Sequence, residues 1–340
     1  MRKINGIKSV DFVIKAKGFG VVNWNGSASL YSHQAGKYVD NHLLPKLRNV
    51  DMLKVKKLDD ITDEARLYIS QNCIRNAIFK DFTHGLKEVS LGNVNDVLPS
   101  LVGLVRGYVI AEGSTSLKRK SPLLITDFLS DENTKLNYEQ FSQSAARNET
   151  SIFSKHTTGD VTYTAHGSIN IEDLQFIALE DSLGRSSYRE IITEQEGLDL
   201  AEKITEYLCG LDFEGTYSPK ASFANNYVRI NAISKAGEAG ILLNNDAILL
   251  VVKEIISLIS NLYISRSRAY VEVVEIHIDY NSGKAMRIKL NSEDISSTPE
   301  EPFAIYYEAQ SFSAAEYEEK IKQQHAEKEK NRAKKEKNKK

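Results

Sequence analysis

The alternation of apolar and polar residues predicts a series of strands along the chain. It is most regular in residues 6–16, where Val10, Phe12 and Ile14 are separated by polar positions, and we expect this strand to be central in a sheet. Similar patterns predict strands or extended segments in six further regions: 67–69, 102–110, 121–128, 217–233, 270–280 and 285–290. A turn signal at residues 281–284 indicates that the last two of these segments pair as a hairpin.

A spacing of three and four residues between apolar positions predicts helices. Ile74, Ala77 and Ile78 share one side of a helix, and Ser70 before them matches an N-cap, because its hydroxyl can accept a bond from a free backbone N–H. Residues 188–208 and 247–262 carry the same spacing over longer stretches.

Three regions depart from these regular patterns. Residues 27–64 are poorly periodic and predict an inserted loop or subdomain between a strand and a helix. Residues 143–167 predict a projecting hairpin, with strand-like flanks at 150–154 and 161–165 around a central turn. Residues 313–340 are rich in Glu and Lys, and we expect a frayed helix or a disordered tail there.

The composition indicates a soluble globular protein and changes this picture little. The chain has 340 residues, 41% of them hydrophobic and 26% charged, without a long uncharged apolar run or a secretory signal. We therefore expect no membrane span. Cys73 and Cys209 are far apart and fit a reduced, cytoplasmic compartment without disulfides.

The charge distribution is more informative than the net charge of -2. Residues 326–340 contain eight basic and three acidic residues, a net of +5, which leaves -7 for residues 1–325. A nucleic-acid site in the body of the protein must therefore be a local patch, because the overall field mildly repels a polyanion.

The motifs of common enzymes are absent from the sequence. It contains no Walker loop, no glycine-rich dinucleotide motif, no zinc-protease motif and no nucleophile elbow. His33 and His42 have no regular metal-ligand spacing, and neighbouring carboxylates such as Asp59 and Asp60 point apart on a regular element. This favours a binding or assembly protein over an enzyme, without a metal or a cofactor.

The start of the helix after Ser70 is the strongest candidate site. Free N–H groups and the helix dipole suit a phosphate there, and the side chains of Gln71, Asn72 and Arg75 could strengthen its binding. An ordinary capped helix with polar residues facing water is the alternative interpretation.

Other candidates combine aromatic, amide and basic residues. Trp24 between Asn23 and Asn25 could stack on a base or contact a ribose, or it could be a buried residue at a strand end. Basic residues near two predicted strand ends could contact phosphates or could belong to a solvated turn: Arg106, Lys118, Arg119 and Lys120. The predicted hairpin at 143–167 contributes four further candidates: Phe153, Lys155, His156 and Thr157.

Several blocks in one order carry a family resemblance. They are residues 6–12 (GIKSVDF), 20–26 (GVVNWNG), 67–75 (LYISQNCIR), 103–109 (GLVRGYV), 121–124 (SPLL) and 240–247 (GILLNNDA). Together they resemble the Cas-seven backbone subunit of the type I-F variant (type I-Fv) CRISPR surveillance complex, or Cascade, over about residues 1–307. The Lys-rich tail lies outside the resemblance.

The resemblance implies an α+β fold with a modified RNA-recognition-motif (ferredoxin-like) palm, an antiparallel sheet and helices on one side. Residues 1–312 would form this single unit, with 27–64 as a finger or web insertion and 143–167 as a β-hairpin thumb. Residue Phe153 or His156 would be the wedge that displaces a base.

The resemblance also implies a function and partners. Copies of the subunit would assemble as a filament along the spacer of the guide RNA (crRNA), holding its backbone so that the bases pair with target DNA. Other Cascade subunits would cap the guide ends, and cleavage would belong to a recruited helicase-nuclease, so no catalytic residue is expected.

Two alternatives stay open at this point. A metal-dependent ribonuclease on the same fold could cut bound target RNA, with Asp40 or Asp160 as the candidate carboxylate. A single-copy RNA-binding module would differ from the filament subunit only in its stoichiometry on one RNA.

Overall fold

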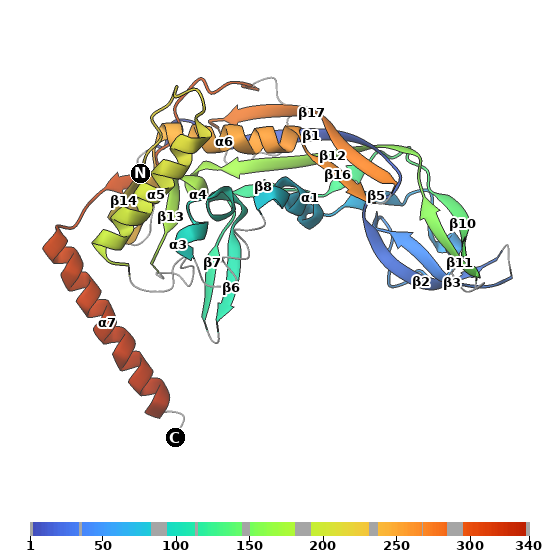
Figure 1. The fold of residues 1–340 in the computed structure, drawn as a ribbon, viewed down its shortest axis with the longest axis horizontal. Helices are drawn as coiled ribbons and strands as arrows, with labels where there is room; N and C mark the ends of the chain where they lie inside the picture. The colour runs from blue at the N-terminus through green and yellow to red at the C-terminus, as the bar shows by residue number, and fades with distance from the viewer. Residues whose placement is uncertain are drawn as a thin grey trace.

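The protein is a mixed α+β structure in which a long curved sheet carries several smaller sheets (Figure 1). The computed structural model describes residues 3–33, 36–82, 94–112, 115–144, 150–180, 192–230, 237–266, 268–283 and 295–337. Among these residues, no helix is both long and apolar enough to cross a lipid bilayer.

The large sheet is antiparallel and has β1 in its interior. Within the part of the chain that the structure describes, its eight strands are, in spatial order, β16 (Tyr263–Arg266), β17 (Ala269–Asn281), β1 (Ser9–Phe19), β12 (Asp160–Asn170), β9 (Phe128–Ser130), β5 (Arg66–Ile69) and β4 (Leu47–Arg48), with β8 (Leu123–Ile125) also paired to β12. The central strand predicted over residues 6–16 is therefore confirmed. The predicted hairpin partner at 285–290 lies outside the described residues.

Both faces of the first half of β1 are buried. Val10, Phe12 and Ile14 belong to the apolar core, and the intervening Asp11 is also inaccessible to solvent. Its two carboxylate oxygens accept hydrogen bonds from the Ser168 hydroxyl at 2.5 Å and from the Asn281 amide at 3.2 Å. Burial raises the pKa of Asp11, because the carboxylate loses its hydration inside the sheet. The hydrogen bonds from Ser168 and Asn281 offset part of this rise.

Helices cover this sheet and join it to the others. Among the described residues, five α-helices lie in the body: α1 (Gln71–Ile78), α3 (Val94–Val97), α4 (Ile171–Gln175), and the longer pair α5 (Glu194–Leu211) and α6 (Asn245–Ser260). Two short 3-10 turns, η1 (Leu58–Asp60) and η2 (Lys80–Phe82), lie before and after α1 in the chain. Side chains of Thr193 and Asn244 cap α5 and α6, and α6 packs against β17 and α5. The helices predicted at 188–208 and 247–262 are thus present, with shifted ends.

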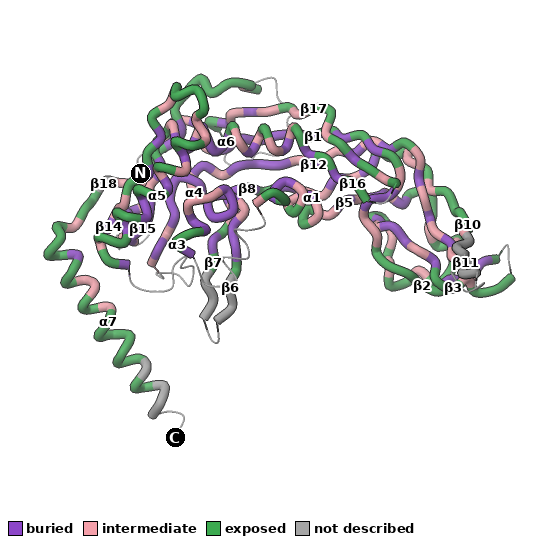
Figure 2. Tube along the Cα trace, viewed as in Figure 1, coloured by how far each residue is buried: buried purple, intermediate pink, exposed green. Residues whose placement is uncertain are grey.

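Three smaller sheets extend the fold. The first contains β10 (Asn137–Ser144), β11 (Thr150–Thr157), β3 (Lys37–Pro45) and β2 (Trp24–Ser32). The second contains β13 (Phe176–Ala178), β15 (Glu238–Leu243), β14 (Ala221–Arg229) and β18 (Tyr307–Ala309). The third is the hairpin of β6 (Tyr108–Glu112) and β7 (Thr115–Arg119). In Figure 1 the first and third of these sheets extend from the same side of the large sheet. Buried residues run along β1 and β12 (Figure 2).

The strand predicted over residues 102–110 is wrong in its first half. Val102–Arg106 forms a π-helical turn, η3, and the strand begins only at Tyr108. A side chain at Gly103 would overlap the carbonyl of Val97, so glycine lets this turn pack directly against α3. Lys118 and Arg119, which the sequence places near a predicted strand end or in a solvated turn, lie on β7.

The predicted hairpin at 143–167 is also wrong in its pairing. β11 pairs with β10 and, over two residues, with β3, whereas β12 pairs with β1 in the large sheet. Gly159 lies where the chain crosses between the two sheets, and its carbonyl accepts the Gly20 N–H at 3.1 Å. The actual hairpin is β10–β11, whose first strand is too polar to stand out by apolar alternation.

The poorly periodic region 27–64 contains most of the β2–β3 hairpin. Its register shifts between Trp24 and Gly26 and again between Ala28 and Leu30. Each such bulge inserts one residue and reverses the inward-facing position, which destroys a period of two.

The segment after residue 313 is helical over α7 (Ala314–Lys337). Its beginning packs against the body, where Tyr317 is fully buried, and most of its remaining length is exposed (Figure 2).

We expect Gly167→Ala to destabilise the protein by about 1–3 kcal/mol, because the new methyl group would overlap the Phe12 ring in the centre of the large sheet. Gly159→Ala is the matched control, since its methyl group would have no neighbour within 4 Å and should change stability by less than about 0.5 kcal/mol. Urea unfolding of both variants measures the difference. Equal unfolding midpoints would show that the sheet relaxes around residue 167.

Candidate nucleic-acid interface

Strand β5 ends at Ser70, and α1 begins directly after it. The Ser70 hydroxyl accepts the Cys73 N–H at 3.4 Å, so the predicted N-cap is confirmed. Ile74 and Ile78 are buried beneath the helix, while Gln71 and Asn72 are exposed. The Asn23 amide donates to the Ser70 hydroxyl at 3.5 Å. Two predicted sites that lie far apart in the sequence therefore meet at the start of α1.

A carboxylate already occupies the N-terminus of α1. The Gln71 N–H donates to Asp127 Oδ1 at 2.8 Å, and the other oxygen of Asp127 forms an ion pair with Arg48. This carboxylate sits where the sequence predicts a phosphate, and it satisfies the same helix dipole. The sequence prediction missed Asp127 because it lies in a separate segment, between β8 and β9.

Two of the predicted phosphate contacts are internal. Arg75 donates to the carbonyls of Leu123, at 2.9 Å, and Arg106. Arg119 is buried and donates to the carbonyls of Leu104, at 3.1 Å, and Asp173, at 3.0 Å. Burial lowers the pKa of both guanidinium groups. The sequence predicts that Arg75 and Arg119 contact a phosphate, but in the structure both guanidinium groups hold backbone carbonyls, so a phosphate contact by either residue stays a prediction.

The neighbouring basic candidates are more accessible. Lys118 is exposed on β7. Lys120 forms an ion pair with Asp173 at 2.6 Å, although its side chain is 65% exposed. The Arg106 guanidinium donates to the Asn76 side chain at 3.0 Å. Lys120 and Arg106 could therefore meet a ligand only in addition to their present partners.

An aromatic and basic cluster lies on the sheet of β2, β3, β10 and β11. The Lys155 ammonium is 4.2 Å from the centre of the Phe141 ring and 5.9 Å from the Trp24 ring. Phe141 stacks on Phe153 with ring centres 5.5 Å apart. Trp24 is partly exposed and also packs against the core, so its interpretation as a buried residue holds in part, and its contact with a base or ribose stays a prediction. Asn25 is exposed beside it.

His156, predicted as a possible base wedge, is buried. Its Nδ1 lies 2.7 Å from Nε2 of His42, whose Nδ1 lies 2.6 Å from the Ser154 hydroxyl. Burial, together with the neighbouring His156, lowers the pKa of His42 from 6.5 to about 4, and burial also lowers the pKa of His156. This neutral pair joins β3 to β11, so His156 connects two strands and does not project. Thr157 donates to the Asn137 carbonyl at 3.5 Å and closes the same hairpin.

Cations that the sequence did not reveal as site residues lie beside the start of α1. Lys46 lies 6.0 Å from the centre of the Tyr68 ring, and Arg48 lies 4.1 Å from it. Lys46 and Arg266 both act on Cys73, whose pKa is raised mainly by burial and lowered in part by these two charges. Neither Lys46 nor Arg266 forms an ion pair with a carboxylate of the described residues.

We call the resulting surface the α1 patch. It consists of Asn23, Lys46, Tyr68, Ser70 and Arg266. Tyr68 belongs to the 67–75 block, and Lys46 follows the β2–β3 hairpin directly, but only the fold brings Arg266 close.

The two aspartates considered for a ribonuclease lie apart from this patch. Asp40 is exposed on β3 and accepts a hydrogen bond from Ser29 at 2.6 Å, and Asp160 is the first residue of β12. Among the described residues, no three His, Cys, Asp or Glu side chains gather as metal ligands.

Comparison with known protein families finds a match over most of the chain. A family model described as "Type I-Fv CRISPR-associated protein Cas7fv-like" matches residues 6–310. The chain belongs to this Cas7fv-like family. The match includes all of the α1 patch and ends just before α7.

Two further comparisons add little to the family match. A chain from a structure entitled "CRISPR RNA-guided surveillance complex, pre-nicking" is similar at 11% identity, over 92% of this chain and 99% of that one, with a TM-score of 0.25. A comparison with curated proteins gave no match.

Acidification should weaken the β3–β11 junction of this Cas7fv-like protein. Because the pKa of His42 is lower in the folded state than in the unfolded chain, the unfolded chain takes up the proton first as the pH falls. Stability should therefore be full above pH 6.5 and should fall between 6.5 and about 4, by about 2 kcal/mol at pH 5 from His42 alone.

Urea unfolding between pH 7.5 and 5 measures this effect. His42→Gln should be less stable at pH 7.5 and should show a flatter pH profile, whereas the exposed His33→Gln should keep the wild-type profile. Parallel profiles for wild type and His42→Gln would contradict the assignment.

Proposed function

We propose that this chain is a backbone subunit that binds the guide RNA of a type I-Fv CRISPR surveillance complex by its sugars and phosphates. The observation that carries the proposal is the family match over residues 6–310. Guide sequences vary, so such a subunit must hold the RNA backbone without reading base edges.

The chemistry of the α1 patch supports backbone binding. Lys46 and Arg266 supply charge without a competing carboxylate among the described residues, and Asn23 and Ser70 supply hydrogen-bonding groups beside them. Point charges and small polar groups suit phosphate and ribose of any sequence. In this proposal the phosphate lies beside α1, on the Lys46 and Arg266 side, because Asp127 already accepts the Gln71 N–H at the helix start.

The cluster around Lys155 is the second proposed contact. Trp24 and Phe153 offer aromatic faces for a base, and the Lys155 ammonium lies 5.9 Å from the centre of the Trp24 ring and 4.2 Å from that of Phe141. Since His156 is buried, Phe153 remains the candidate for a wedge that displaces a base.

We assign the palm, finger and thumb by analogy with the family that the sequence resembles. The large antiparallel sheet would be the RNA-recognition-motif-like palm, β2 and β3 in the 27–64 insertion would be the finger, and the β10–β11 hairpin would take the thumb role. Copies would repeat along the crRNA and leave its bases free to pair with target DNA.

The remaining partners follow from the same proposal. Other Cascade subunits would cap the two ends of the guide, and a recruited helicase-nuclease would cut the target. The subunit itself would hold the RNA without catalysing a reaction.

The double variant Lys46→Ala/Lys155→Ala tests this proposal. It should weaken binding to single-stranded RNA by about tenfold, equally for unrelated sequences, and should lower the slope of log affinity against log salt by about 1–2. Fluorescence anisotropy across a salt series measures both. Lys253→Ala, on the exposed face of α6, is the matched control and should bind like wild type. An unchanged salt slope in the double variant, or a sequence-selective loss, would contradict the proposal.

Asp127→Asn should strengthen RNA binding by several-fold. The substitution removes a negative charge from the start of α1 and releases Arg48 from its ion pair, so a phosphate meets less competition. The same anisotropy measurement detects the gain, with Asp131→Asn on the exposed turn after β9 as the control. Weaker binding would mean that Asp127 chiefly keeps the site in shape.

A further inference from the structure

Helix α7 lies beyond the residues that match the family, and its beginning is firmly anchored. Ser313 and Glu316 form a capping box at its start. The fully buried Tyr317 donates its hydroxyl to the Ile192 carbonyl at 2.9 Å, and Lys320 forms an ion pair with the largely buried Glu180 at 3.0 Å. A tail that only aided solubility would not require a buried tyrosine and a capped, directed helix.

The distal half of α7 projects from this anchor. Lys328, Lys330 and Lys334 are exposed, and no glycine or proline interrupts residues 314–337. At about 1.5 Å per residue, Lys334 lies roughly 25 Å along the helix from Tyr317. The anchor thus fixes the direction in which a basic segment leaves the body (Figure 1).

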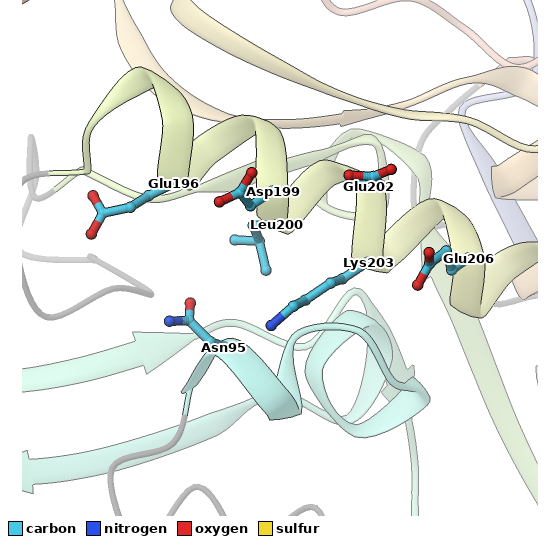
Figure 3. Close-up of a pocket in the computed structure, with 7 residues that line it drawn as sticks. All are labelled: Asn95, Glu196, Asp199, Leu200, Glu202, Lys203 and Glu206. Carbon is cyan, nitrogen blue, oxygen red and sulfur yellow. The ribbon is translucent and has the colours of Figure 1, made fainter.

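An acidic surface of matching dimensions lies on α5. Asp199, Glu202 and Glu206 are exposed and are spaced three and four residues apart; we call them the α5 stripe. They border a hollow of about 460 Å³ between α5 and α3. Figure 3 shows Lys203 extending from the same helix toward Asn95 of α3.

The charges of the two helices complement each other in both signs. Residues 326–340 carry a net +5, and lysines at 330, 334 and 337 are spaced four and three apart, like the acids of the α5 stripe. Glu327 and Glu329 interrupt the basic segment, as Lys203 interrupts the acidic one. A phosphate backbone would repel these glutamates, whereas a protein surface of mixed sign can pair with them. The pattern therefore favours a protein partner over a nucleic acid.

The helix does not reach the α5 stripe of its own chain. α7 meets α5 at the first turn of α5, where Thr193, Leu198, Tyr317 and Ile321 line a shared hollow. From there the two helices diverge (Figure 1). An uninterrupted helix cannot turn back, so α7 leaves the α5 stripe of its own chain uncovered.

We propose that the distal half of α7 docks on the α5 stripe of a second copy of this chain. The two surfaces differ, so the contact is head-to-tail and each copy keeps one free surface of each kind, which generates an open row of subunits. The inference rests on the proposed assembly of copies along RNA, to which it adds the contact between them.

Charge reversal tests the contact. The α7 variant is Lys328→Glu/Lys330→Glu/Lys334→Glu, and the α5 variant is Asp199→Lys/Glu202→Lys/Glu206→Lys. Glu196 is left unchanged because it closes the capping box of α5 with Thr193. Glu300→Lys/Glu301→Lys, exposed elsewhere, controls for a change in net charge. All substituted residues are exposed, and thermal melting verifies that each variant folds.

RNA of one-site length and RNA of several sites are compared at low salt, where exposed ion pairs are least screened. Each charge-reversed variant should bind the short RNA like wild type and the long RNA about tenfold more weakly, through lost cooperativity. An equimolar mixture of the two variants should recover cooperative binding, because each supplies the surface that the other lacks. Recovery in the mixture requires contact between copies.

Three results would overturn the inference. These are unchanged cooperativity in the single variants, no recovery in the mixture, or a loss confined to the α7 variant that also affects the short RNA. The last result would mean that α7 contacts nucleic acid. If wild type fails to bind RNA, the proposed function is wrong, and sedimentation of the RNA-free mixture against each variant alone still tests the contact.

Discussion

The position of α1 depends on two arginines that satisfy backbone carbonyls around the π-helical turn η3. Arg75 donates to the carbonyl of Arg106 at the end of this turn, and Arg119 donates to that of Leu104 within it. A π-helical turn leaves carbonyls without the usual i+4 partner, and an unpaired carbonyl in the core is costly. The planar guanidinium can satisfy several carbonyls at once, so each arginine ties the turn to another element. Arg75 thereby connects α1 to β8 and η3 and holds the α1 patch in place.

This internal use of arginine shapes the chemistry of the surface. With Arg75 and Arg119 committed to carbonyls, Lys46 and Lys155 carry much of the charge offered on the proposed RNA side. A lysine is a mobile point charge that accepts any phosphate geometry, whereas the arginine fork is suited to fixed pairs of acceptors. Indifference to sequence is what a guide-holding subunit requires. Tyr68 and Trp24 fit the same requirement, because every base has a flat face.

The sequence predicted the elements whose local and tertiary preferences agree. The cap at Ser70, the central strand around Phe12 and the helix after Asn244 all follow from short-range patterns that the core then reinforces. The errors occur where a distant segment decides. Residues 102–106 read as a strand by apolarity alone, but contact with Val97 at Gly103 and the donation by Arg119 favour a π-helical turn.

The candidate site was predictable only in part, for the same reason. A basic residue next to a helix start suggests phosphate binding, yet the sequence does not reveal whether its guanidinium turns outward or meets a carbonyl. Arg75 and Arg119 turned inward, and Asp127 reached the helix start from another segment. Arg266 joined the patch only because β16 packs against α1. Contacts of this kind depend on tertiary pairing, which no local pattern encodes.

The separation of charge between body and tail has a physical consequence for any assembly. Residues 1–325 carry a net -7, so a row of such bodies along a polyanion would repel both the RNA and each other. Residues 326–340 carry a net charge of +5, so a tail that lies on the body of a neighbouring copy would neutralise most of that body's negative charge. Exposed charges act over about 8–10 Å at physiological salt, so a contact between copies can lower the repulsion that the RNA meets nearby. The same basic residues would give less benefit on a free tail, because a charge held several Debye lengths from the body does not offset the body's field.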